Sequence, residues 1–146
     1  MPLSIVYLQP LTELFEALVA NGDERWFHPH PLTEEEAENL CNYHGHNVYR
    51  VLTEDGLVLA YGMLRGFDEE YEVPSLGLAV HPQVRREGLG RMLMQELHKY
   101  ARLRGARRVR LKVYPDNIAA IKLYESFGYE FEPEPEGEEL VGIARI

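Results

Sequence analysis

The stretch from residue 75 to residue 104, SLGLAVHPQVRREGLGRMLMQELHKYARLR, decides the fold. It opens with an apolar run, Leu76 to Val80, which predicts a strand, and continues after His81-Pro82 into a basic loop with two glycines, Arg85 to Gly90. Apolar residues then recur at helical spacing as far as Gly105, which predicts an amphipathic helix that ends there. Strand, glycine loop and helix in this order form an anion site, because N–H groups at a helix N-terminus lack intrahelical partners and lie at the positive end of the dipole.

The spacing of the glycines excludes two common phosphate loops. A P-loop has Lys followed by Ser or Thr after its second glycine, and a dinucleotide fingerprint has three glycines; neither occurs here. Arg85-x-x-Gly88-x-Gly90 instead resembles the R/Q-x-x-G-x-G/A loop of the GCN5-related N-acetyltransferase (GNAT) family, which wraps the pyrophosphate of acetyl-coenzyme A. The resemblance implies that the cofactor is bound by Arg85, Arg86, Gly88, Leu89 and Gly90.

A second motif follows downstream. Residues 107–114, RRVRLKVY, alternate basic and apolar side chains and predict a strand. After a turn at Pro115-Asp116, residues 117–129, NIAAIKLYESFGY, are similar to the N-x-x-A-x-x-x-Y-x-x-x-G-F/Y segment of the same family. The two motifs occur in the expected order within residues 76–131, and on both together the chain is identified as a member of the family.

The family resemblance implies a specific fold. It is an α/β fold in which a mixed central β-sheet, with splayed fourth and fifth strands, is flanked by helices, and the pantetheine arm of the cofactor enters the gap. Residues 1–146 are expected to form a single N-acetyltransferase domain. Periodicity alone predicts no more than one α/β domain.

The remaining elements are predicted from periodicity and turn residues. Thr33 and Glu36 form a capping box for a second helix, and Asp55-Gly56 predicts a hairpin turn. The expected elements are strand Leu3–Leu8, helix Pro10–Ala20, a helix from Thr33 to about Tyr43, strands Val48–Thr53 and Leu57–Leu64, and a final strand pair Tyr129–Glu132 and Glu138–Ile146.

Charge and composition narrow the class of partner. The net charge is −9, yet residues 85–112 hold ten of the fifteen Lys and Arg and two acids, which suits a polyanionic ligand such as coenzyme A. The acidic remainder argues against nucleic acid as a partner. Apolar content is 45%, without a membrane span or signal peptide, and the one cysteine excludes an internal disulfide. We expect a cytoplasmic protein that is a monomer or a homodimer.

The family resemblance also implies catalytic roles. Tyr124 stands where the family often carries a tyrosine beside the coenzyme A sulfur, as general acid. A phenol pKa of about 10 keeps it protonated at neutral pH, although Tyr124 can equally be a packing residue. An oxyanion donor is implied on the splayed fourth strand, at Leu78, Ala79 and Val80. Asn117 positions the pantetheine or caps its helix.

The sequence offers several candidates for a general base and for the residues of the acceptor site. Glu72, just before the fourth strand, lies where several relatives place such a group, and the imidazoles of residues 28, 30, 44 and 46 are alternatives. The loop between the first two helices covers the acceptor in this family, which implies substrate contacts from Trp26, His28 and His30.

Several alternatives stay open at this point. The expected acceptor is the primary amine of a small molecule, with an amino sugar as one candidate; a polyamine, a peptide N-terminus, or a non-catalytic acyl-coenzyme A sensor are others. Two His-x-His pairs could bind zinc, but they lack the spacing of common sites, and no metal is expected. Cys41 is expected to be a core residue.

Overall fold

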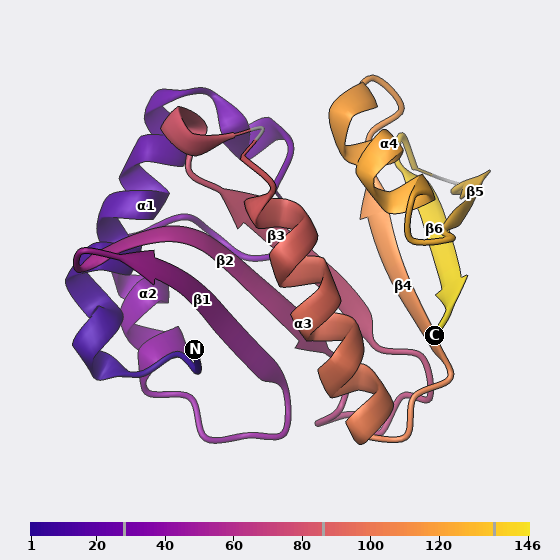
Figure 1. Ribbon diagram of the computed structural model, residues 1–146, viewed down its shortest axis with the longest axis horizontal. Coiled ribbons are helices and arrows are strands. Elements are labelled where there is room, and N and C mark those ends of the chain that lie inside the picture. Colours follow the sequence, from indigo (N-terminus) through magenta and orange to yellow (C-terminus); the bar gives the residue numbers. More distant parts are fainter. Residues whose placement is uncertain (28, 86, 136) are drawn as a thin grey trace.

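A computed structural model describes residues 1–27, 29–85, 87–135 and 137–146. It shows a six-stranded mixed sheet flanked by helices (Figure 1), and a mixed sheet flanked by helices is what the family resemblance implies. The strand order is β1-β2-β3-β4-β6-β5. The strands are β1 (Val48–Glu54), β2 (Leu57–Arg65), β3 (Ser75–Val80), β4 (Arg108–Val113), β5 (Glu130–Pro133) and β6 (Leu140–Arg145). The helices are α1 (Leu8–Ala20), α2 (Glu34–Cys41), α3 (Leu89–Leu103) and α4 (Ile118–Glu125), with 3-10 turns η1 (Ile5–Tyr7), η2 (Asp23–Arg25) and η3 (Pro82–Val84).

The sheet opens between β3 and β4. Every strand junction is antiparallel except this one, which is parallel and, in the described chain, is registered at the single pair Ser75 and Arg110. Beyond that pair the two strands diverge (Figure 1). They correspond to the fourth and fifth strands of the prediction, so the expected splay is present.

The first predicted strand is wrong. Residues 5–7 form the 3-10 turn η1, and α1 begins at Leu8. Pairing with β1 is limited to an isolated bridge between Pro2 and Arg50 and a bond from the Leu3 N–H to the Tyr49 carbonyl. A six-residue apolar run fits a strand or a helix equally, and Pro10, in the first turn of α1, favours the helix.

Turn and cap chemistry confirms two other predictions. Asp55 and Gly56 have φ of 51° and 78°, the positive angles that a tight hairpin turn between β1 and β2 requires. The Thr33 hydroxyl accepts a hydrogen bond from the Glu36 N–H at 3.1 Å and caps α2. The helix ends at Cys41, two residues before the predicted end.

Helices cover both faces of the sheet with apolar side chains. On one face α3 contributes Leu93, Met94 and Leu97 to a core that also contains buried residues of β1 to β4, β6 and α4. On the other face α1 and α2 pack over β1 and β2, around Phe15 and Tyr61. No helix in the described ranges has the length and apolar character needed to cross a membrane.

A buried polar pair lies within the α3 core. His98 is 3% exposed, and its Nε2 lies 2.7 Å from the Tyr129 hydroxyl. Burial, together with nearby Arg102, lowers the pKa of His98 to about 4. The imidazole is therefore neutral in the folded protein at neutral pH.

This pair predicts acid sensitivity. An unfolded histidine has a pKa of about 6.5, so between pH 6.5 and pH 4 the unfolded chain binds a proton that the folded chain does not. The free energy of unfolding should fall across this window by up to about 1.4 kcal/mol per pH unit, on the order of 3 kcal/mol in total.

Urea denaturation from pH 7 to pH 4 measures this dependence, and His98→Leu should have a smaller slope. Exposed His44 is the control, since His44→Gln should keep the wild-type slope. An unchanged slope in His98→Leu would contradict the assignment.

Candidate active site

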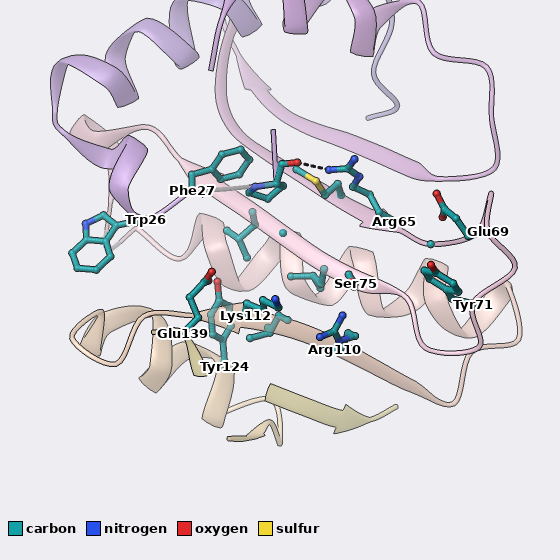
Figure 2. Close-up of a pocket in the computed structure, with 17 residues that line it drawn as sticks. Trp26, Phe27, Arg65, Glu69, Tyr71, Ser75, Arg110, Lys112, Tyr124 and Glu139 are labelled. Atoms are coloured by element: carbon teal, nitrogen blue, oxygen red, sulfur yellow. Dashed lines mark hydrogen bonds between the residues drawn. The ribbon is translucent and has the colours of Figure 1, made fainter. Parts of the chain in front are cut away.

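Two cavities meet where β3 and β4 diverge. The loop cavity, about 510 Å³, is lined by Val84, Arg85 and residues 88–91 and by the start of α4. The sheet cavity, about 460 Å³, lies over the C-terminal end of β2, the start of β3 and the middle of β4 (Figure 2). Both are lined by Trp26, Phe27, Leu78, Lys112 and Tyr124. A molecule in one cavity can therefore contact a molecule in the other at this junction.

The loop cavity contains unpaired backbone donors. Gly88 is the N-cap of α3 with φ of 82°, and no side chain caps the helix. Within the described ranges, the N–H groups of Leu89, Gly90 and Arg91 have no hydrogen-bond acceptor; the first intrahelical bond is from Met92 to the Gly88 carbonyl. A Cβ built on Gly88 would meet none of the described atoms beyond its chain neighbours within 4 Å. The donor set and the helix dipole fit a phosphate.

Arg85 is held by an ion pair. Its guanidinium donates two hydrogen bonds to the Asp23 carboxylate, at 2.7 and 3.3 Å, and a third to the Val80 carbonyl. Asp23 is 5% exposed and lies in η2, so the pair joins the loop before α3 to the segment after α1. Arg85 lines the loop cavity with part of its charge already compensated. Arg86 lies outside the described residues.

The edge of β3 that faces β4 also offers backbone groups. Leu78, Ala79 and Val80 pair with β2 on one side, and in the described chain the β4 side has no strand partner beyond Ser75. Alternate peptide groups of a strand point to each side, so part of this edge faces the cavities. All three residues line the loop cavity.

Asn117 lies at the start of α4 without capping it. Its side chain makes no cap hydrogen bond, and it lines the loop cavity. Helix capping, the alternative explanation of this residue, is therefore not its role in this structure.

Tyr124 lies on α4 at the junction of the two cavities. It is 9% exposed, and burial raises its pKa to about 12. The phenol is protonated over the whole physiological range and can act as a donor. Its ring also packs near Tyr129, with centroids 6.0 Å apart, so Tyr124 belongs to the core and lines the junction as well.

Charged side chains of both signs line the sheet cavity. The acids are Glu69 and Glu139, and the bases are Arg65, Arg110 and Lys112 (Figure 2). Lys112 pairs with Glu134 at 2.7 Å, outside the cavity lining. Glu139, just before β6, lines the sheet cavity together with Tyr124.

Comparison with known proteins decides the family. The sequence model described as "Acetyltransferase (GNAT) family" matches residues 11–129. The chain belongs to this family.

Its relatives agree with the GNAT assignment. The curated protein "[Ribosomal protein bS18]-alanine N-acetyltransferase" of Escherichia coli is 36% identical over 78 residues, 53% of this chain and 51% of that protein. This chain thus spans about half the length of the curated relatives it matches first. The solved structure of the ribosomal-protein-S18-alanine N-acetyltransferase from Escherichia coli superposes with a TM-score of 0.72 at 25% identity, over all of this chain and 92% of that one.

Two further solved structures support the fold. The GNAT domain of S. lividans PAT has a TM-score of 0.84 at 17% identity, over all of this chain and 89% of that chain. The PaiA N-acetyltransferase from Thermoplasma acidophilum, solved in complex with coenzyme A, has a TM-score of 0.79 at 16% identity, over all of this chain and 97% of that chain.

Two residues expected at the GNAT acceptor site lie elsewhere. Glu72 is exposed and lines a different cavity with Arg104 and Arg108, near the start of β3 and away from Tyr124. His30 is 9% exposed and bonded to the Tyr61 hydroxyl at 3.1 Å and to the Pro31 carbonyl; it lines neither the loop nor the sheet cavity, and burial lowers its pKa. Aromatic neighbours make His30 part of the α1 core.

The remaining residues singled out in the sequence lie partly at the cavities and partly in the core. Trp26 lines both cavities, whereas His28 lies outside the described residues. Cys41 is buried in the core between α1 and α2, and burial raises its pKa. In the ranges that the structure describes, no group of three or more His, Cys, Asp and Glu could hold a metal ion.

Sequence reasoning missed Glu139, Arg65, Ser75 and Arg110 as lining residues of the sheet cavity. One signal was available for Arg110, because the alternation in residues 107–114 puts Arg108, Arg110 and Lys112 on one face of a strand. The cavity that this face of the strand lines depends on the order of the strands in the sheet, and the local pattern of residues does not specify that order.

Proposed function

We propose that this chain is an acetyl-coenzyme A-dependent N-acetyltransferase that transfers an acetyl group directly to the primary amine of a small molecule, with residues 1–146 as one transferase domain. The observation that carries this proposal is the junction of the loop cavity and the sheet cavity at Tyr124. A donor in one cavity and an acceptor in the other meet there, which satisfies the proximity that a direct transfer needs.

The loop cavity fits coenzyme A. The unpaired N–H groups at residues 89–91 suit the pyrophosphate. The Asn117 side chain makes no capping hydrogen bond to α4 and can therefore hydrogen-bond the pantetheine arm. The β4-facing edge of residues 78–80 offers N–H donors to the thioester oxygen, where negative charge develops during attack.

One side chain in the sheet cavity and one at the junction supply the proton transfers. An alkyl ammonium must lose a proton before it attacks, and Glu139 in the sheet cavity can accept it. Tyr124 donates to the leaving sulfur; with a pKa of about 12 against about 8.5 for a free thiol, it stabilises the thiolate chiefly as a hydrogen-bond donor.

The sheet cavity favours a small acceptor. Its volume, about 460 Å³, is within the range of small-molecule sites, about 300–1,000 Å³. Trp26 and Tyr71 offer aromatic faces to a sugar ring, so amino sugars are a first class to test. Arg65 and Arg110, which form no ion pair within the described residues, disfavour a polyamine. A second candidate is a peptide N-terminus, because the relatives from Escherichia coli are named for alanine N-acetylation of a ribosomal protein.

The direct test is release of free thiol from acetyl-coenzyme A with amino sugars, amino acids, short peptides and polyamines as acceptors. We expect turnover with at least one class, and none in Gly88→Asp, where a carboxylate would occupy the phosphate position. Calorimetry of coenzyme A binding runs alongside. Tight binding without turnover would contradict a transferase and support a sensor, and absence of binding would contradict the cofactor assignment.

Tyr124→Phe keeps the packing of the ring and removes the donor. We expect kcat to fall roughly 10²-fold, with little change in KM for acetyl-coenzyme A, because the hydroxyl acts on the leaving group. Tyr100→Phe is the control, since Tyr100 packs against Arg50 outside both cavities. An unaffected kcat in Tyr124→Phe would leave Tyr124 with its packing role alone.

Glu139→Gln tests the base. We expect kcat/KM to fall most below the pKa of the acceptor amine, about 8 for a peptide α-amine and about 10 for an alkylamine, and to recover above it, where the amine loses its proton without help. The neighbouring exposed Glu138 provides a matched control, Glu138→Gln. A deficit that is equal at every pH would show that Glu139 is not the proton acceptor.

A further inference from the structure

Three polar side chains form a row across the sheet at the closed end of the splay. Arg65 of β2 is in register with Ser75 of β3, which is in register with Arg110 of β4. Residues in register on neighbouring strands point to the same face, and all three line the sheet cavity. At a strand spacing of about 4.8 Å, the two arginines flank Ser75 from about 5 Å on each side.

The row lies on the face of the sheet away from α3. The residues next to it in sequence, Leu64, Leu76 and Leu111, belong to the α3 core. On the row's own face, α1 and α2 cover β2 through Tyr61 and Met63. The cavity begins where that cover ends, so Arg65, Ser75 and Arg110 face open space in the cavity (Figure 2).

The row has spare hydrogen-bond donors. Among the described residues, the Arg110 guanidinium and the Ser75 hydroxyl make no hydrogen bond or ion pair. Arg65 donates through Nη1 to the Pro29 carbonyl at 2.6 Å, which leaves most of its five N–H donors. Guanidinium groups match carboxylate and phosphate in geometry, and a charge-assisted bond to them is about twice as strong as a neutral one.

The position of the row relative to the junction sets the size of the ligand. Ser75 and Leu78 are three residues apart on β3, about 10 Å at the rise of a strand. Leu78 and Tyr124 lie at the junction, whereas Arg110 lines the sheet cavity and not the loop cavity. The arginine side chains reach part of that distance, so a ligand of amino-acid or monosaccharide size can contact the row and the junction together.

We propose that the acceptor amine carries an anionic group, a carboxylate or a phosphate, which Arg65, Ser75 and Arg110 bind while the amine lies at the junction. The inference rests on the proposed function and names the acceptor class. Glu69 and Glu139 in the same cavity exclude a ligand that is anionic throughout and suit one that carries an amine as well. The chain as a whole carries a net charge of −9 and repels anions. The two arginines in the cavity attract an anionic group locally.

The test compares acceptors that differ in the anion. The pairs are alanine and alaninamide, glucosamine 6-phosphate and glucosamine, and C-terminally amidated alanyl peptides with Glu or Gln at the second position. We expect the anionic member of at least one pair to have kcat/KM at least about ten-fold higher, the factor that roughly 1.4 kcal/mol of binding provides. The pair with the greatest difference identifies the carrier of the anion.

Variants of β4 attribute the preference to the row. Arg110→Gln should abolish the ten-fold preference through KM for the anionic amine, and Arg110→Lys should restore part of it. Arg108→Gln is the matched control, because Arg108 shares the face of β4 but lines a different cavity. Calorimetry of coenzyme A binding shows that each variant is folded.

The outcomes separate this inference from the proposed function. Turnover of neutral and anionic members at equal kcat/KM in every pair would overturn the inference and leave the transferase intact. A preference that persists in Arg110→Gln would overturn the assignment to the row. Absence of thiol release with all six amines would overturn the proposed function and the inference with it.

Discussion

The pairing of Ser75 with Arg110 is the constraint on which the site depends. It joins the two halves of the sheet in register at the start of β3, and the strands diverge beyond it. Each strand is anchored on its far side instead, β3 by six residue pairs with β2 and β4 by six with β6. The sheet can therefore open without losing either half. The peptide groups along the gap, which a continuous sheet would pair with the neighbouring strand, need other hydrogen-bond partners. A buried peptide group without a partner costs free energy.

The opening is coupled to the anion site by the chain itself. β3 runs along the gap and leads through η3 into the loop before α3, so the free strand edge and the free N–H groups of the helix face the same cavity. The Arg85–Asp23 ion pair joins this loop to the segment that also carries Trp26 and Phe27. One side of the junction is thus fixed by α3 and the other by the connection between α1 and α2.

Local signals in the sequence predicted the elements whose causes are local. The capping residue Thr33, the Asp55-Gly56 turn and the apolar stripe of α3 each determine structure within a few residues. The strand predicted at residues 3–8 failed because an apolar run without alternation does not distinguish a strand from a helix. The loop motif led to Gly88, which the structure shows as the N-cap of α3 beside the loop cavity.

The acceptor side could not be predicted in the same way. The row of Arg65, Ser75 and Arg110 depends on the register of three strands, and Glu139 reaches the cavity through a hairpin at the end of the chain. Glu72 and His30 were reasonable from chain position, yet one faces solvent and the other is bonded inside a core. Burial and register are long-range properties, and short patterns of residue types do not encode them.

A crystal structure of the chain with coenzyme A tests the central claim most directly. The account predicts the pyrophosphate at the N–H groups of residues 89–91, the pantetheine along the β4-facing edge of β3, and the sulfur at the junction beside Tyr124, with the sheet cavity open to an acceptor. Coenzyme A bound with its sulfur away from that junction, or with its pyrophosphate away from the start of α3, would contradict it.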